Sequence, residues 1–133
     1  HTPDALVNVL KALRGAGFKR IVTVFGCGGN RDRTKRPIMG EAVARYSDVA
    51  VLTSDNPRFE DPEAILKDVL PGLREAREVE VDRRKATAKA VEMLGPDDAL
   101  LIAGKGHEDY QIIQGTKHHY SDQEVVRELL GCA

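Results

Sequence analysis

Short apolar runs alternate with helix-like segments along this chain, and this alternation limits the folds open to it. Runs at residues 19–25, 48–53 and 99–103 have the length and apolar content of buried strands. Apolar residues at helical spacing predict five helices, at residues 2–15, 37–46, 62–70, 83–94 and 121–130. Strands and helices that alternate in this way predict an α/β fold, a doubly wound and mainly parallel sheet with room for three layers.

Two shorter features complete the predicted elements. Val79–Val81 has the pattern of a short strand, and Tyr110–Ile113 and Lys117–Tyr120 flank a glycine turn as a C-terminal hairpin. The 133 residues, of which 41% are hydrophobic, suit a single domain with one core. The chain opens at His1 in a predicted helix start, so we expect residues 1–133 to be one domain of a longer protein.

Charge and cysteine content weigh against several classes of function. Lys and Arg number 20 against 21 Asp and Glu, and the net charge of −1 gives no overall field to attract nucleic acid or an anionic membrane. No apolar run approaches the roughly 20 residues of a membrane-spanning helix. Cys27 and Cys132 match no metal spacing or disulfide framework, so we expect no metal site and a reducing, cytoplasmic setting.

A glycine-rich, basic loop at residues 26–37 follows the first strand. Arg31 stands where a dinucleotide fingerprint needs its third glycine, and no Walker A sequence occurs anywhere in the chain. Flexible backbone N–H groups beside several basic side chains still predict an anion-binding loop, in which the basic residues are Arg31, Arg33, Lys35 and Arg36. The alternative is a solvated basic loop without a ligand.

A polar turn at residues 53–62 follows the second strand. Pro57 fixes its own φ and keeps Asn56 out of the helical region, so the turn is stiff. An arginine beside a carboxylate and an amide suits a small zwitterion. Arg58 would bind its carboxylate, and Asp55 or Asn56 its amine or amide. The alternative is an Asx-type turn that leads into the next helix.

A third loop, which begins at Gly104, follows the most apolar run. Because ligands bind at the carboxyl ends of parallel strands, we expect the three loops to form one site at that edge of the sheet. Within it, His107 is either an acid or base or a hydrogen-bonding strut, and Lys105 either reaches a phosphate or is solvated. Cys27 has no neighbouring base in sequence that would make it a nucleophile, and His118–His119 are expected at the surface.

Six motifs occur along the chain in a definite order: HTPDAL at residues 1–6, FGCGGNRD at 25–32, KRP at 35–37, MG at 39–40, DNPR at 55–58 and AGKGHEDYQ at 103–111. Together they resemble the carboxyl-terminal domain of the Mur ligase family over nearly the whole chain. Within that family they are most similar to the ligases that add meso-diaminopimelate to UDP-N-acetylmuramoyl-L-alanyl-D-glutamate.

This resemblance implies an ATP-dependent amide ligase of three domains in the bacterial cytoplasm. It would act in peptidoglycan precursor synthesis, and so in cell wall biogenesis, cell shape and cell division. It also implies a Rossmann-like fold for residues 1–133. The P-loop, the Mg²⁺ ligands and a carbamylated lysine belong to the family's central domain, and the UDP sugar to its N-terminal domain. No catalytic residue is then expected here, and the fragment alone is expected to be inactive.

The resemblance also implies binding roles. Contacts with meso-diaminopimelate are expected from Arg31, Asp55, Asn56, Arg58, Gly104 and Glu108. The ATP side is expected near His1, Arg33 and Lys35. Implied partners are the protein's own central and N-terminal domains and, through them, the UDP-MurNAc-dipeptide; neither nucleic acid nor membrane is expected. Lysine lacks the distal carboxylate of diaminopimelate, so Arg58 favours diaminopimelate. The alternatives are a lysine-adding ligase, a folylpolyglutamate synthetase domain and a non-catalytic nucleotide-binding module.

Overall fold

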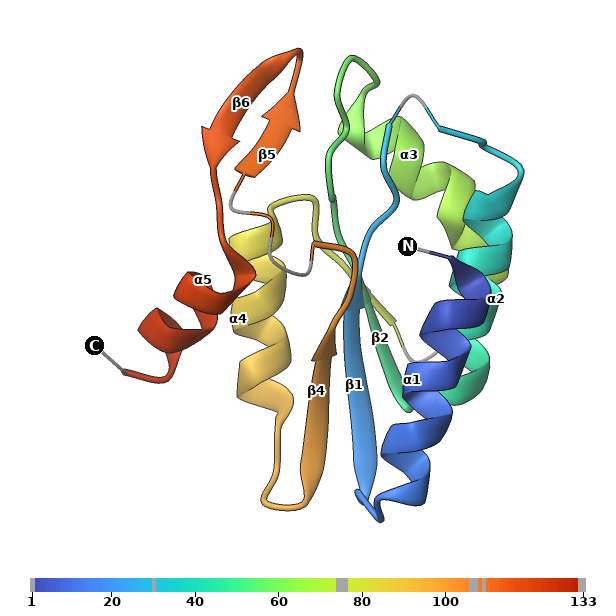
Figure 1. The fold of residues 1–133 in the computed structure, drawn as a ribbon, viewed down its shortest axis with the longest axis vertical. Coiled ribbons are helices and arrows are strands. Elements are labelled where there is room, and N and C mark those ends of the chain that lie inside the picture. The colour runs from blue at the N-terminus through green and yellow to red at the C-terminus, as the bar shows by residue number, and fades with distance from the viewer. Residues whose placement is uncertain (1, 30, 74–76, 106–107, 109, 132–133) are drawn as a thin grey trace.

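The computed structural model describes residues 2–29, 31–73, 77–105, 108 and 110–131 (Figure 1). Four strands in this part of the chain form one parallel sheet in the order β3-β2-β1-β4. They are β1 (Arg20–Phe25), β2 (Val49–Leu52), β3 (Arg77–Val79) and β4 (Asp98–Ile102). Val22 of β1 lies opposite Val49 of β2 and Leu100 of β4. The predicted α/β class and its parallel sheet are confirmed.

Helices cover both faces of the sheet and produce the three predicted layers (Figure 1). One face carries α1 (Pro3–Gly15), α2 (Lys35–Tyr46) and α3 (Pro62–Val69), which continues into the 3-10 turn η1 (Leu70–Gly72). The other face carries α4 (Arg83–Met93), and α5 (Asp122–Leu129) packs beside it. Right-handed crossovers that run in opposite directions along a sheet place their helices on opposite faces. Because α4 lies on the opposite face from α2 and α3, the crossovers change direction along the sheet. The strand order therefore reverses between β1 and β4.

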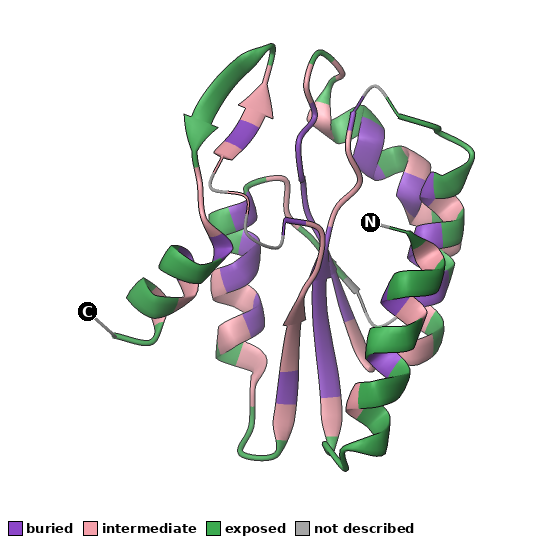
Figure 2. Cartoon of the chain, in the orientation of Figure 1, coloured by how far each residue is buried: buried purple, intermediate pink, exposed green. Residues whose placement is uncertain are grey.

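The core consists of two apolar layers, because alternate residues of a strand point to opposite faces. Ile21 and Phe25 of β1 pack with α1, α2 and α3, whereas Val22 and Val24 pack with α4. The α4 contacts include Ala86 and Ala90, which are completely buried. These small side chains let the helix approach the sheet closely. The central strands are accordingly the most continuously buried part of the chain (Figure 2).

Local capping residues fix the helix starts. Thr2 Oγ1 accepts a hydrogen bond from Ala5 N, and Ser121 Oγ accepts one from Glu124 N. Proline occupies the first turn of α1 and of α3, where its missing N–H has no cost. Most predicted bounds agree with the structure to within two residues. The short strand predicted at 79–81 instead lies at 77–79, because residues 77–79 are the ones that pair with β2.

Three apolar residues within the predicted helix ranges are exposed: Val9, Ile38 and Leu130 have exposed fractions of 45%, 51% and 60%. Val9 lines the opening of a cavity described below. In α2, the buried side includes Arg36 and Met39, which turns Ile38 outward. Leu130 lies beyond the last residue of α5. Apolar spacing alone identifies the helices correctly but overestimates their buried faces.

The predicted hairpin is present as β5 (Tyr110–Ile113) and β6 (Thr116–His119), which pair antiparallel. Its turn has positive φ angles at Gln114 (50°) and Gly115 (76°), as two-residue hairpin turns require. In Figure 1 the hairpin stands above the carboxyl ends of the parallel strands. It therefore lies next to the loops that follow β1, β2 and β4.

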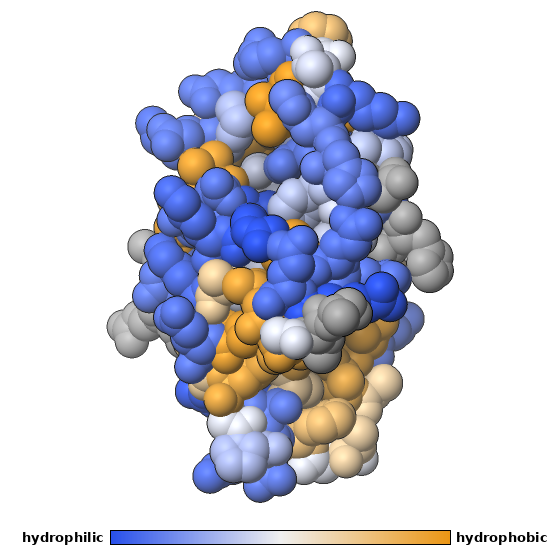
Figure 3. All heavy atoms as spheres, turned by 90° about the vertical axis from the view of Figure 1, so that its left-hand side faces the viewer, coloured by the Kyte–Doolittle hydropathy of each residue, from blue (hydrophilic) through white to orange (hydrophobic). Residues whose placement is uncertain are grey.

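The apolar strand β4 lies at the edge of the sheet, and four of its five residues are only partly buried. Hydrophobic side chains gather around α4, α5 and β4 on this side of the molecule, below the polar hairpin (Figure 3). Within the described residues, no helix has the length and apolar content needed to cross a membrane.

Candidate functional site

A cavity of about 800 Å³ opens at the carboxyl ends of β1 and β4, where the strand order reverses. This is the switch point at which parallel α/β sheets bind ligands. All three predicted loops contribute to its lining. The predicted ligand residues found there are Arg31, Lys35, Asp55, Asn56, Arg58, Gly104 and Glu108. Arg33 is not among the lining residues, and His1 and His107 lie outside the described residues.

The glycines of the first loop serve close backbone packing. Gly29 N donates a 2.7 Å hydrogen bond to Asn56 O, and a Cβ added at Gly29 would lie only 1.8 Å from Pro57 O. A Cβ added at Gly26 would lie 2.5 Å from Thr53 O. No side-chain movement can relieve contacts with backbone atoms. The sequence therefore places glycine where the loop after β1 meets the turn after β2, and the N–H of Gly29 is not free to bind an anion.

The basic residues of this loop do not act as one group. Arg36 is 2% exposed and binds Glu60 at 2.9 Å and Asp68 at 2.8 Å. Burial lowers the pKa of Arg36, but the hydrogen bonds and charges of these carboxylates outweigh it and raise the pKa. Arg33 is exposed and also pairs with Asp68, at 3.0 Å. Arg36 lines the cavity together with Arg31 and Lys35, but it is held by two carboxylates, whereas Arg31 and Lys35 are exposed.

Lys105 is buried, so neither predicted role for it, phosphate contact or solvation, is correct. Its Nζ donates hydrogen bonds to Asn56 Oδ1 at 3.2 Å and Tyr110 O at 2.9 Å. The same nitrogen lies 3.1 Å from Asp55 Oδ1. Among the described residues, none donates an aligned hydrogen bond to that oxygen, even though the ion pair is close. Lys105 thus neutralises and positions the buried carboxylate of Asp55, a residue that lines the cavity.

Arg58 adopts a left-handed conformation, with φ of 56°. For a residue with a Cβ this conformation costs about 1–2 kcal/mol. Its backbone N donates to Ile112 O at 2.9 Å, and its O accepts from Gly115 N at 3.3 Å. Its Nη1 donates to Gly29 O at 2.8 Å. The hairpin and the first loop together hold the guanidinium at the cavity.

Cys27 lines the cavity but is not activated. Burial raises the pKa of its thiol to about 11, although the Arg36 charge acts in the opposite direction. The thiol is therefore protonated at neutral pH, which agrees with the prediction that it is not a nucleophile. Among the described residues, no three His, Cys, Asp or Glu side chains come together as a metal site would require.

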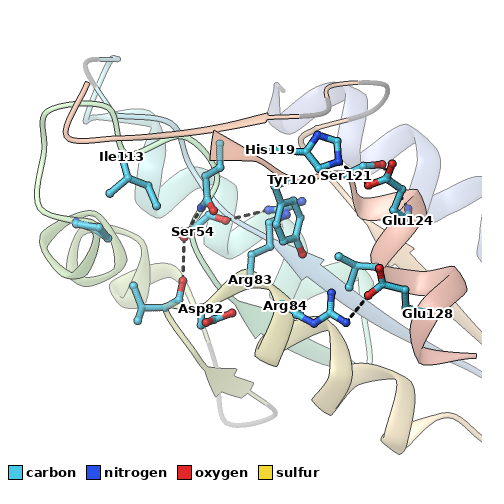
Figure 4. A pocket seen from close by; sticks show the side chains of 14 residues that line it. Ser54, Asp82, Arg83, Arg84, Ile113, His119, Tyr120, Ser121, Glu124 and Glu128 are labelled. Carbon is cyan, nitrogen blue, oxygen red and sulfur yellow. Dashed lines mark hydrogen bonds and ion pairs between the residues drawn. The ribbon is translucent and has the colours of Figure 1, made fainter. Parts of the chain in front are cut away.

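A second cavity, of about 560 Å³, lies between α4, α5 and the hairpin (Figure 4). An ion pair between Arg84 and Glu128 and a 2.6 Å contact between His119 Nε2 and Glu124 cross its edges. His119 is exposed, as predicted for this part of the hairpin. The back wall includes Ser54, which directly precedes the turn of the first cavity.

Arg83 is a supporting residue that sequence reasoning missed. It is 1% exposed, pairs with Asp122 at 2.8 Å, and donates to Ser54 O at 3.0 Å and Ala103 O at 3.1 Å. These carbonyls stand where the loops after β2 and β4 begin. The only signal in the sequence is its position in the first turn of α4, where a cation opposes the helix dipole and needs a partner elsewhere.

The sheet topology and the cavity define a Rossmann-like α/β domain with a ligand-sized site at its switch point. The chain belongs to the Mur ligase family, since residues 1–106 match the family profile described as "Mur ligase, glutamate ligase domain".

Named relatives cover the rest of the chain as well. The UDP-N-acetylmuramoyl-L-alanyl-D-glutamate--2,6-diaminopimelate ligase of Lawsonia intracellularis is 66% identical over 134 residues, which is 99% of this chain and 28% of that protein. The protein of the same name from Aquifex aeolicus is 54% identical over 98% of this chain and 28% of its own length. A solved structure of a ligase with this name superposes with a TM-score of 0.94 at 44% identity, again over 98% of this chain and 28% of the other. The chain therefore spans less than a third of these relatives.

Proposed function

We propose that this chain is the amino-acid-binding domain of a three-domain ligase that adds meso-diaminopimelate to UDP-N-acetylmuramoyl-L-alanyl-D-glutamate in peptidoglycan precursor synthesis. Residues 1–133 form its C-terminal domain, and the N-terminal and central domains belong to the longer protein. The observation that supports this most is one cavity that has arginines beside carboxylates and a glycine. The printed names of the relatives supply the substrate.

The chemistry of diaminopimelate fits this cavity. The end of the molecule that does not react keeps an ammonium and a carboxylate. The carboxylate of Asp55, which also pairs with Lys105, and Glu108 suit the ammonium. Arg58 and Arg31 suit the carboxylate; within the described residues, Nε and Nη2 of Arg58 make no hydrogen bond, and Arg31 is exposed. Asn56 and Gly104 complete the wall around the head group.

Lysine would leave this arrangement incomplete, because it has no carboxylate at that end. Loss of one partner of a buried charged pair costs about 2–5 kcal/mol, or roughly 30-fold to several-thousand-fold in discrimination. Arg58 is half-buried and held in a strained conformation, so it cannot easily withdraw to solvent. This favours diaminopimelate over lysine, and it favours the same ligase over a folylpolyglutamate synthetase.

ATP and Mg²⁺ are assigned mainly to the central domain. ATP would activate the carboxylate of the nucleotide-linked substrate, and this chain would hold the amino acid with its other amine directed toward that carboxylate. The residues of this chain offer the phosphates of ATP only positive charge. Lys35 is exposed at the cavity, and Arg33 is exposed but already pairs with Asp68. The role of His1 toward ATP remains a proposal from the family resemblance. A bacterial cytoplasmic location follows from the same reaction.

The rival function from another class is a non-catalytic module that binds nucleotide through the loop after β1. This alternative is less favoured, because the N–H of Gly29 already donates a hydrogen bond to Asn56 O and Arg36 is held in buried ion pairs. A titration of the isolated chain with ATP discriminates between the two, since a nucleotide-binding module should bind ATP without other domains.

The proposal is tested by Arg58→Ala and Glu108→Gln in the full-length ligase that contains this chain. Both variants should raise the KM for diaminopimelate at least tenfold, because each removes a charged contact. The KM for ATP should stay within about twofold, since neither residue contacts it. Lys67→Ala, a change of similar type at an exposed position of α3 that does not line the cavity, is the control. An unchanged diaminopimelate KM in both variants would refute the assignment.

A further inference from the structure

Residues 111–113 of β5 contact the turn at residues 54–58. Gln111 Nε2 donates to Ser54 Oγ at 2.9 Å and to Asp55 O at 2.7 Å. The next residue, Ile112, donates from its N to Asn56 Oδ1 at 2.9 Å. Its carbonyl accepts from the backbone N–H of the strained Arg58, as described above. The turn is therefore shaped by a strand that lies more than fifty residues later in the sequence.

Gln111 contacts the turn through its side chain, whereas Ile112 does so through its backbone. It is 8% exposed, and its amide orientation is fixed by chemistry. Ser54 donates its hydroxyl proton to Val81 O at 2.8 Å, so Ser54 Oγ can only accept from Gln111. Asp55 O is likewise an acceptor. Both partners require the NH₂ group of the amide, and no other orientation satisfies them.

We propose that Gln111 is a positioning residue for the amino-acid site, with β5 as the template that presets the turn from Asp55 to Arg58. Gln111 itself does not line the cavity of about 800 Å³ but faces the second cavity, behind the turn. It acts on the ligand only through the position of Asp55 and the residues that follow. This inference rests on the function proposed above, and it adds a residue to which neither the motifs nor the relatives assign a role.

The expected consequence is selective. Without the amide donors, Ser54 Oγ and Asp55 O lose a buried partner, and the turn can relax away from β5. The carboxylate and guanidinium that receive the amino-acid head group then lose their mutual geometry. Lys35, on the far side of the cavity, belongs to α2 and has no connection to β5 among the described contacts. The amino acid should be affected and the nucleotide should not.

The test is steady-state kinetics of Gln111→Met and Gln111→Asn in the full-length ligase. Methionine keeps the length without the donors, and asparagine keeps the amide but withdraws it by one methylene. We expect a rise of about 10- to 100-fold in the KM for diaminopimelate, equivalent to two lost buried hydrogen bonds, with the KM for ATP within about twofold. Preference for diaminopimelate over lysine should fall in parallel. Gln123→Met, an exposed glutamine on α5, is the matched control and should change nothing.

Two outcomes would overturn the inference. One is a diaminopimelate KM within twofold of wild type in both folded variants. The other is a joint rise in the KM values for diaminopimelate and ATP together with a lowered Tm, which would mean a general structural role. If methionine prevents folding, the asparagine variant decides. A wild-type enzyme without preference for diaminopimelate would instead refute the proposed function, so the two failures are distinguishable.

Discussion

Replacement of Arg83 by methionine should destabilise the fold far more than the same replacement of its neighbour Arg84. Both residues belong to α4, and both pair with a carboxylate of α5. The Arg83–Asp122 side chains are 0% and 8% exposed, whereas the Arg84–Glu128 side chains are 52% and 57% exposed. The comparison therefore sets a buried arginine against an exposed one on the same helix, with the same substitution at both positions.

The magnitude follows from the charge left behind. Arg83→Met leaves Asp122 buried without its cation, and removal of one partner of a buried pair costs about 3–5 kcal/mol. It also leaves Ser54 O and Ala103 O without a donor. With an unfolding entropy of about 2.1 cal/mol/K per residue, a chain of 133 residues should lose roughly 11–18 °C in Tm. Arg84→Met should cause only a small shift, because exposed pairs contribute little.

Chemical denaturation and thermal unfolding of the purified variants measure these differences. The double variant Arg83→Met/Asp122→Asn should recover part of the loss, since it removes the unpaired charge as well. Equal destabilisation by Arg83→Met and Arg84→Met would refute the reasoning. So would a double variant that is less stable than Arg83→Met alone.

Two further predictions concern the cavity itself. Gly29→Ala should cost at least the 1–3 kcal/mol of an overpacked core in denaturant unfolding, because its Cβ would meet Pro57 O, while Gly15→Ala, with nothing within 4 Å of its Cβ, should leave stability unchanged or raised. Equal effects would refute this. Cys27 has a pKa raised from 9.0 to about 11 by burial, so the stability it contributes is complete below pH 9 and is lost as the pH rises toward 11. Iodoacetamide labelling followed by peptide mass spectrometry should find Cys27 slower than in the denatured chain at pH 9, and equal rates would contradict the assignment.

The sequence allows prediction of features that depend on neighbouring residues. Thr2 and Ser121 cap their helices through contacts three residues away, and Pro57 restricts the backbone at its own position and at Asn56. The edge on which the three loops meet follows from the alternation of strands and helices. For these reasons the fold class, the hairpin and the position of the cavity could be derived without coordinates.

Buried charges could not be predicted in the same way, because their partners are distant in sequence. Arg36 and Arg33 belong to the same basic stretch of sequence and cannot be told apart there. Arg36 is nevertheless buried, because it pairs with carboxylates 24 and 32 residues away. Lys105 lies between glycines, which suggests exposure, but its partner Asn56 is 49 residues earlier. The supporting role of Gln111 depends on contacts 56 and 57 residues away. Only the folded topology brings these groups together.

The sheet register implies a definite order in which the domain can be completed during synthesis. β1 pairs with β4 across 78 residues, for example Arg20 with Asp98, so the central strand remains without a neighbour on one side until most of the chain exists. The turn at residues 54–58 waits longer still, since its partners in the hairpin extend to Gly115. Contacts of such sequence separation slow folding. The turn at residues 54–58 is therefore made in the first half of the chain but reaches its final shape only near its end.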